Sequence, residues 1–441
     1  MFRKIALLIG CFASTFSLFA QSTPQVLTLE QAILTALERN YSIKIARNQV
    51  RLAENDNTRG NAGMLPIITG TAQPSGTLNS TNQKYFDGAR APLVQRGVLN
   101  RNFVATVQLT WTLFNGLSMY ITKEKLNELV KAGDAQAQVT IESTIANVAS
   151  MYYAVMQQEQ QTRSLEDALA ISRERRRLAK DQYEIGQGAK VLYLNAQVDF
   201  NADTAALISQ RLTLRNTKTQ LNQALIQTLD TDFQTADTIK LNRDMVYETL
   251  KDQTLQQNPA IILARYNTNI ARLEIRNQEA LLWPILDFVS SYGYTGLRNG
   301  GSGFGVQSGR SANLIAGLRV TAPIFDGFNQ RRRIQGARIS EEITRQQQED
   351  QTVQIESALS QTYRTYRNNL DLVDLEARNV EVAKQNVTIS FDRYKIGVAA
   401  PIELREAQRN LVATQARLFQ AQYNAKVSEI ELLRLSSQIM K

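Results

Sequence analysis

The residues of this chain that could carry chemistry are few, because its 441 positions include no histidine and one cysteine, Cys11. A Ser-His-Asp or Cys-His site needs an imidazole, and a zinc site needs several cysteine or histidine ligands. The composition therefore excludes these sites, and we expect neither a metal nor a cofactor. Only carboxylates, lysines and hydroxyls remain, so an enzyme is not expected.

One pair of carboxylates has a suggestive spacing. Glu403 and Glu406 follow Pro401 at the predicted start of a helix, and side chains three residues apart share one helix face. Two carboxylates on one face could attract cations. Acidic residues in a first helical turn are also favoured by the helix dipole, so the spacing alone leaves a structural role open.

The N-terminus indicates export from the cytoplasm. Arg3 and Lys4 precede an apolar stretch over residues 5–20, which is the pattern of a signal peptide spanning residues 1–20. The segment ending at Cys11 also resembles a lipoprotein box, but the apolar run continues past it and favours ordinary cleavage. An exported chain with interleaved acids and bases does not suit nucleic-acid binding, despite its net charge of +9.

Long helices must position these residues. Proline is absent between Pro92 and Pro259, where good helix formers predominate. We predict a helix over residues 117–183, on the order of 100 Å long, and shorter helices over residues 28–64 and 190–228. The long helix cannot lie in one globular core and must pack along another helix, as in a coiled coil. The mean hydropathy of −0.29 excludes a multi-span helical membrane protein.

Two segments change to the period of a β-strand. Apolar and polar residues alternate over residues 103–113 and 314–324, which predicts strands with one apolar and one wet face. Partner strands are expected near residues 65–73 and 285–294. Strands of about ten residues suit a tilted span of an outer membrane. Four strands cannot close a barrel, so three chains would contribute twelve.

Aromatic residues stand where the predicted strands meet the helices, as a membrane-interface girdle requires. These residues are Trp111, Phe114, Trp283 and Phe325. The alternative for the strands is an ordinary soluble sandwich, which would leave the edges of two isolated hairpins uncovered.

An internal repeat organises the chain. Asn40 and Asn258 begin similar patterns 218 positions apart, and the later patterns recur 211 positions apart. The later patterns are Phe-Asn-Gly at 114–116 with Phe-Asp-Gly at 325–327, and Tyr-Glu-Ile-Gly at 183–186 with Tyr-Lys-Ile-Gly at 394–397. We therefore predict one repeat over residues 21–230, a linker over 231–248, a second repeat over 249–437 and a tail over 438–441.

Two runs of arginine need an interpretation. Arg173, Arg175, Arg176 and Arg177 are expected to form a solvated helix face, which is the usual role of such runs. The run 331–333 follows the second strand pair, and contact with lipid phosphates there is a hypothesis.

Taken together, these features resemble the TolC-like outer-membrane factor family over essentially the whole mature chain. The resemblance implies an α+β membrane protein. It would be a homotrimeric channel with a twelve-stranded β-barrel in the outer membrane, four strands from each chain. A long α-helical coiled-coil barrel would continue it into the periplasm, and no enzymatic activity is implied.

The resemblance also implies a role and partners. The chain would be the exit duct of a tripartite efflux system, passing small toxic compounds from a periplasmic adaptor and an inner-membrane transporter to the exterior. The channel of a type I polypeptide secretion system and a non-conducting envelope spacer remain as alternatives. The partners would be two further copies, the adaptor, the transporter and outer-membrane lipid.

Site residues follow from the same resemblance. Glu403 and Glu406 match acidic positions that narrow the periplasmic entrance in this family. Ala399 and Leu192 replace an arginine and an aspartate that the family often has, so Tyr394, Arg405 or Lys190 would complete the closing network. The turns carrying Gly186, Gly188, Gly397 and Val398 would form the tip that meets the adaptor, unless these residues only cap helices.

Overall fold

The computed structural model describes residues 25–86, 88, 91–235, 238–301 and 305–440. The signal peptide predicted over residues 1–20, with Cys11, lies outside them. The chain divides into two compact units. Of the described residues, unit 1 comprises those up to Glu38, those of Val148–Lys240 and those of Val373–Tyr423, and unit 2 comprises the remainder.

Three long helices have a substantial part of their length in each unit. They are α3 (Ser118–Glu184), α7 (Asn329–Lys395) and α8 (Pro401–Leu435). The bounds of α3 confirm the long helix predicted over residues 117–183, and α7 has the same length of 67 residues. None of the helices, within the ranges given above, is long and apolar enough to cross a membrane.

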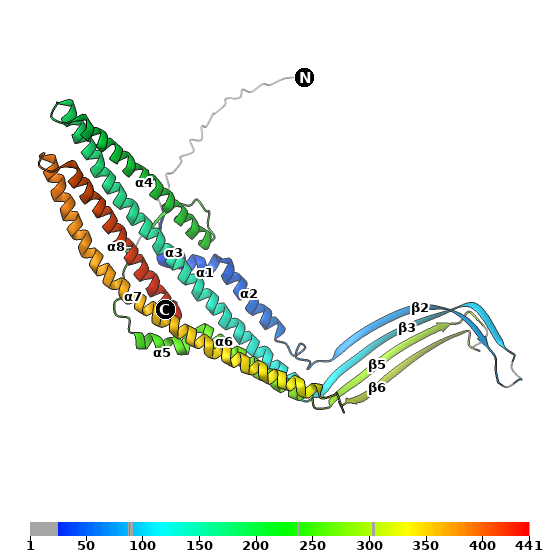
Figure 1. The fold of residues 1–441 in the computed structure, drawn as a ribbon. Helices are drawn as coiled ribbons and strands as arrows, with labels where there is room; N and C mark the ends of the chain where they lie inside the picture. The colour runs from blue at the N-terminus through cyan, green and yellow to red at the C-terminus, as the bar shows by residue number, and fades with distance from the viewer. Residues whose placement is uncertain (1–24, 87, 89–90, 236–237, 302–304, 441) are drawn as a thin grey trace, which may run out of the picture. The chain divides into compact units, whose positions relative to one another are not determined.

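Unit 1 is a bundle of helices. It contains α1 (Leu29–Arg39) and α4 (Lys190–Leu225), and α4 lies along the second part of α3 as α8 lies along α7 (Figure 1). Hydrogen bonds join α3 to α8: the Ser164 hydroxyl donates to Gln415 over 2.6 Å, and the Gln157 amide donates to Gln420 over 2.9 Å. A short parallel pair of strands, β1 (Gln25–Leu27) with β4 (Phe233–Thr235), also belongs to this unit.

Unit 2 contains three shorter helices and the main sheet. The helices are α2 (Tyr41–Asp56), α5 (Tyr247–Gln257) and α6 (Pro259–Ala280). The expectation of a single helix over residues 28–64 is wrong, because Asn40 separates two helices, α1 and α2, and α2 ends at Asp56. Asn40 accepts a hydrogen bond from the Ser42 backbone N–H, and Asn258 accepts one from that of Ala260, so each asparagine caps a new helix.

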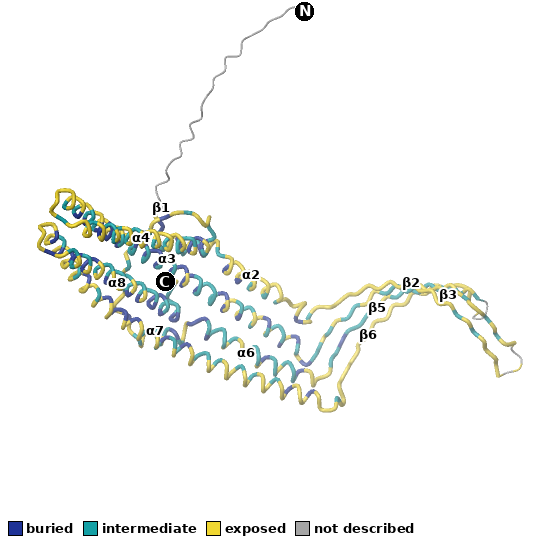
Figure 2. The backbone as a smooth tube through the Cα atoms, turned by 45° about the horizontal axis from the view of Figure 1, so that its top comes forward, coloured by how far each residue is buried: buried dark blue, intermediate teal, exposed yellow. Residues whose placement is uncertain are grey.

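Four antiparallel strands form the main sheet. They are β2 (Ile67–Gln83), β3 (Leu93–Asn115), β5 (Ile285–Arg298) and β6 (Ser308–Thr321), in the order β2-β3-β5-β6 (Figure 1). The strands expected in these regions are confirmed, and all four extend beyond about ten residues. The outer strands β2 and β6 are largely exposed, whereas most of β5 is half-buried (Figure 2).

The register of the strands separates an apolar face from a polar face, because directly opposed residues of an antiparallel pair point the same way. The apolar face carries Phe103, Val107, Leu109, Trp111, Phe288, Tyr292, Tyr294, Leu314 and Leu318. The polar face carries Thr106, Gln108, Thr110, Thr112, Asp287, Ser291, Asn313 and Arg319. The predicted alternation over residues 103–111 is therefore confirmed.

The alternation does not continue unchanged to the end of β3. A bulge between Thr112 and Phe114 shifts the register and pairs Phe114 with Leu286 on the apolar face. Leu113, which was expected to continue the apolar row, is the extra residue. In the second half the strand ends at Thr321, so the expected alternation up to residue 324 stops early.

The residues Phe-Asn-Gly at 114–116 and Phe-Asp-Gly at 325–327 lie where a strand is followed by a long helix, α3 or α7. The side chains of Asn115 and Asp326 accept hydrogen bonds from the backbone N–H groups of Met119 and Gln330, at 3.1 and 2.6 Å. Gly116 has φ +65°, and a Cβ there would lie 2.2 Å from the Ala280 carbonyl oxygen. Only glycine fits that position, because the turn is left-handed and touches α6.

Candidate functional site

The two turns between antiparallel helices have the same backbone. We call residues 185–189, between α3 and α4, the first tip, and residues 396–400, between α7 and α8, the second tip. Gly186 and Gly397 both have φ +77°. The Gly186 N–H donates to the Tyr183 carbonyl and the Gly397 N–H to the Tyr394 carbonyl, at 3.1 and 3.0 Å. Both glycines therefore cap the preceding helix, which a left-handed residue permits.

Tyr394 lies at the base of the second tip and is only 5% exposed. Its ring packs in a small apolar cluster with Ala399 and Leu404, and Phe391 and Leu178 complete the cluster. Burial raises the pKa of the Tyr394 hydroxyl, and the nearby positive charge of Arg175 opposes that rise. The tyrosine is therefore a neutral packing residue over the whole physiological range.

The two predicted gate carboxylates have different surroundings. Glu403 accepts a hydrogen bond from the Arg393 guanidinium at 2.7 Å, and both side chains are close to half exposed. Glu406 is exposed on the next turn of α8. Lys190, at the start of α4, is exposed as well. Glu403 of α8 therefore forms an ion pair with the C-terminal end of α7 in the same chain.

Arg405 has carboxylate partners that its position in the sequence does not reveal. Its Nη1 donates to both carboxylate oxygens of Asp203 on α4, at 2.9 and 2.7 Å. Its Nε lies 3.5 Å from Oδ1 of Asp199, one turn away on α4. Arg175 of α3 donates to the other oxygen of Asp199 at 2.5 Å. Two arginines and two aspartates therefore alternate across three helices.

Hydroxyl and amide groups complete this cluster. The Ser172 hydroxyl donates to Asp203, and the Gln408 side-chain amide donates to the Ser172 hydroxyl at 2.8 Å and to the Ala168 carbonyl at 2.7 Å. We call Ser172, Arg175, Asp199, Asp203, Arg405 and Gln408 the α3-α4-α8 cluster. Charge-assisted hydrogen bonds of this kind are the stronger class, and low solvent exposure strengthens them further.

The α3-α4-α8 cluster can hold α8 against α3 and α4. It has two positive and two negative side chains, so separating α8 from α4 would leave charges without partners at low exposure. Beside it lies a hollow of about 520 Å³ whose lining includes Leu192, Tyr394, Ile402 and Arg405. The arrangement suits mechanical control of helix positions and offers no nucleophile paired with a base.

Most members of the cluster were not predicted from the sequence. Arg175 was expected to belong to a solvated face, and this is wrong because its side chain is only 2% exposed. The same expectation holds for Arg177, which is exposed and pairs with Glu174. A usable signal was the position of Asp203, which follows the buried Ala196 by seven residues and therefore lies on the same stripe of α4. A charge on such a stripe calls for a buried partner.

The predicted interface aromatics lie around the strand-to-helix turns. Trp111 is on the apolar face, and its indole N–H donates to the Met64 carbonyl at 3.1 Å. Trp283 is exposed just before β5, and Phe325 is exposed just after β6. Phe114 joins the apolar face through the bulge.

The tips themselves carry exposed apolar side chains. Ile185 lies in the first tip and Val191 follows it in α4, while Ile396 and Val398 lie in the second tip and Ile402 follows it in α8. A Cβ on Gly188 would approach the Gln182 Cβ to 3.1 Å, so a larger residue there would disturb the first tip. No group of three or more potential metal-ligating side chains occurs in the part of the chain that is described.

Comparison with known proteins decides the family. A family model described as outer membrane efflux protein matches residues 32–225 and 250–437. The chain belongs to this family. It is 21% identical to the outer membrane efflux protein BepC of Brucella suis, over 93% of this chain and 86% of BepC.

Other relatives agree. The outer membrane protein TolC of Escherichia coli is 21% identical over 76% of this chain and 69% of its own length. The crystal structure of the outer membrane protein VceC of Vibrio cholerae superposes with a TM-score of 0.70 at 15% identity, over 92% of this chain and 95% of VceC. The resemblance to TolC-like factors is thus confirmed. This efflux protein lies in the outer membrane with a periplasmic helical extension, and its family and fold are those of channels.

Proposed function

We propose that three copies of this efflux protein assemble into one channel with a twelve-stranded barrel. The observation that supports this is the sheet, which has one apolar face and two edge strands, β2 and β6, each paired on one side only among the described residues. A membrane-spanning sheet needs every backbone group paired, so an open sheet requires closure by other copies. The polar face would then line a water-filled lumen.

The channel would be the exit duct of a tripartite efflux system for small toxic compounds. The names of the family and of BepC support efflux over polypeptide secretion. A non-conducting spacer would have no use for the polar side chains opposite the lipid-facing row, such as Gln108 and the Arg319–Asp287 pair. Periplasmic adaptor and inner-membrane transporter would be its partners.

The periplasmic end would be closed by the second tip and the α3-α4-α8 cluster. Arg405 would hold α8 against α4 through Asp203 and Asp199 in the closed state. Three copies of Glu403 and Glu406 would surround the axis and favour cations. Tyr394 would keep the base of the tip packed, and its buried ring suits that role.

The exposed apolar side chains of the tips support docking to the adaptor. Gly186 and Gly397 set the turns, while Gly188 and Val398 would lie in the contact. The same order of strands and long helices on either side of residues 231–248 supports the duplication proposed for residues 21–230 and 249–437. The aromatic residues at the ends of the strands would mark the periplasmic membrane interface.

Planar-bilayer recording on the purified protein tests this proposal. We expect discrete conductance steps, and chemical cross-linking of the same sample should give a trimer as the largest product. A deletion strain should become hypersensitive to hydrophobic drugs and recover with the intact gene. Steps without drug hypersensitivity, together with loss of a secreted polypeptide, would favour the secretion duct, and absence of steps would leave the spacer.

A further inference from the structure

Three arginines form a cluster where the four-stranded part of the sheet ends, at the last residues of β5 and the first residues of β6. Arg101 lies on β3 directly opposite Arg298 on β5, and Arg310 lies on β6 in the next row of the register, opposite Gly296. All three side chains are exposed. We call them the arginine cluster.

The arginine cluster stands on the apolar face. Arg101 is an odd-numbered residue of the same row that carries Phe103, Val107 and Trp111, and its partner Arg298 continues the row of Tyr294 on β5. The lumen-facing side chains of the sheet point the opposite way. If the apolar face meets lipid, as the proposed barrel requires, the arginines meet lipid too.

The position of the cluster along the strand matches a membrane boundary. Trp111 and Arg101 are ten residues apart, or about 33 Å along a strand and about 25 Å in height at the usual tilt of a barrel strand. An outer-membrane barrel has an apolar band about 25 Å tall. Phe103 and Tyr294, with ring centroids 6.3 Å apart, lie just inside the arginines, where an aromatic girdle is expected.

Within the described part of the chain, the arginine cluster lacks a carboxylate partner of the kind that Arg319, elsewhere on the same sheet, has in Asp287. Arg319, on the polar face of β6, donates to Asp287 at 3.0 Å. None of the three clustered guanidiniums makes an ion pair or side-chain hydrogen bond with any residue that the structure describes. Like charges placed directly opposite each other destabilise a sheet, so Arg101 and Arg298 are a costly pair unless an anion lies between them.

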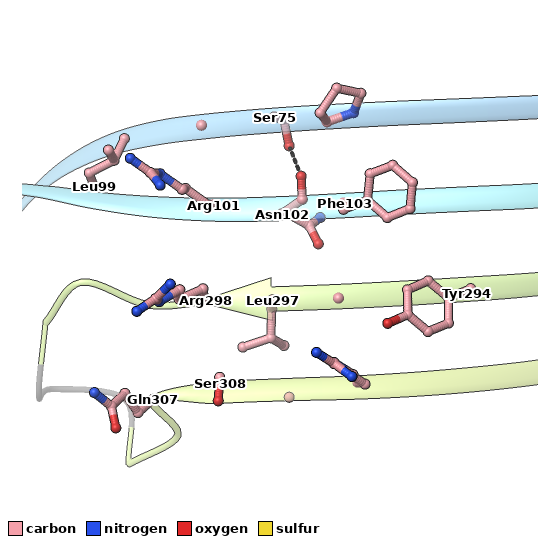
Figure 3. Close-up of a pocket in the computed structure, with 15 residues that line it drawn as sticks. Ser75, Leu99, Arg101, Asn102, Phe103, Tyr294, Leu297, Arg298, Gln307 and Ser308 are labelled. Atoms are coloured by element: carbon pink, nitrogen blue, oxygen red, sulfur yellow. Dashed lines mark hydrogen bonds between the residues drawn. The ribbon is translucent and has the colours of Figure 1, made fainter.

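Space for such an anion is present. The cluster borders a hollow of about 1260 Å³ on the sheet, in which Phe103 and Tyr294 lie beside Arg101 and Arg298 (Figure 3). Small residues of the same rows, among them Gly76, Gly296 and Ser308, leave the space above the strands open. Guanidinium groups bind phosphate oxygens two at a time, which suits a phosphorylated headgroup.

We propose that the arginine cluster binds the phosphate groups of an anionic lipid of the outer leaflet. The proposal rests on the proposed barrel, because only there does the apolar face meet lipid. The acyl chains would lie along the apolar row below Phe103 and Tyr294, and the phosphates would lie between Arg101, Arg298 and Arg310. A trimer would carry three such sites.

Native mass spectrometry of the detergent-purified trimer tests the proposal, with diphosphoryl lipid A as the probe. We expect up to three retained lipid molecules per trimer. The variant R101Q/R298Q/R310Q should bind the probe about a hundredfold more weakly, and each single substitution about fivefold more weakly. The matched control R39Q/R47Q/R51Q removes three exposed arginines of α1 and α2 and should bind like the parent protein.

The comparison arms separate the possible outcomes. Phosphatidylcholine should not be retained, and millimolar inorganic phosphate should not displace lipid A. Displacement of lipid A by phosphate would indicate a site for free anions and would overturn the lipid site. Equal lipid A binding by the triple variant and the parent would overturn the proposal. The conductance steps of both variants are recorded in the same preparation. A variant that conducts but loses lipid supports the site, and absence of steps in the parent protein would refute the barrel instead.

Discussion

The two tips have one backbone and two sets of side chains. At the base of the first tip, Tyr183 is 40% exposed and stacks on Tyr193, with ring centroids 6.4 Å apart. At the base of the second tip, the matching Tyr394 is buried. The Arg393–Glu403 pair crosses the second tip, whereas Gln182 and Leu192 occupy the corresponding positions of the first.

The difference separates what forms a helical hairpin from what holds it in place. The capping glycine forms both turns, because a left-handed residue ends a helix regardless of the side chains nearby. Only the second hairpin has a buried tyrosine ring at its base, whereas Arg405 of α8 bonds to Asp203 of α4 and so joins the two hairpins to each other. We therefore expect substitutions of equivalent residues to have unequal effects wherever side chains are concerned, and equal effects at the glycines.

The largest expected effect is that of Tyr394→Ala. It removes a buried ring from the cluster with Leu404 and should cost about 3 kcal/mol of stability, as large-to-small core substitutions do. Tyr183→Ala removes an exposed stacked ring and should cost only about 1 kcal/mol. The measurement is the midpoint of thermal loss of the helical circular dichroism signal. Equal shifts for the two variants would show that the tips are fastened alike.

Arg405→Ala comes next. It leaves Asp203 without an arginine and Asp199 with Arg175 alone, and because these aspartates keep some solvent contact we expect a loss of about 2–3 kcal/mol. If the cluster holds the closed state, the variant should also show larger or longer conductance steps in a planar bilayer. Arg409→Ala, an exposed arginine one turn further along α8, is the control and should leave both readouts unchanged. Unchanged conductance in Arg405→Ala would remove the cluster from the gate.

Alanine at either capping glycine should have a moderate and equal effect. Nothing lies within 4 Å of a Cβ built on Gly186 or Gly397, so each substitution adds only the strain of a left-handed residue, about 1–2 kcal/mol. The same thermal midpoint measures both. A clearly larger shift for Gly397→Ala would mean that the two backbones are not equivalent in solution.

The smallest effect is expected for Glu403→Gln. The pair with Arg393 is nearly half exposed, so its loss should cost less than about 1 kcal/mol, and the cost should shrink further as salt is added. Thermal midpoints of parent and variant at low and high sodium chloride measure this. A large, salt-independent loss would indicate that Glu403 has a buried partner in the assembled trimer.

Local sequence patterns were enough to predict the strands, the long helix and the turns between helices. The alternation around Trp111, the proline-free stretch that becomes α3 and the Tyr-x-x-Gly turns all follow from local preferences. The break at Asn40 was missed because an asparagine cap can stand inside a helical pattern without disturbing it. The bulge that re-aims Phe114 was missed because one extra residue leaves the composition of a strand unchanged.

The sequence by itself predicted export and showed that the chain has no imidazole, and it determined the long helices, the strand faces and the turn glycines, because each depends on composition or on neighbours within a few residues. The tertiary structure alone decided which charges are paired. Arg405 is about 200 positions from Asp199 and Asp203 in the sequence. Only the packing of α4 against α8 brings its guanidinium close to their carboxylates. It likewise made Arg175 a buried residue and left Arg101 facing Arg298. Electrostatic energy depends on distances through space, which spacing along the chain does not set.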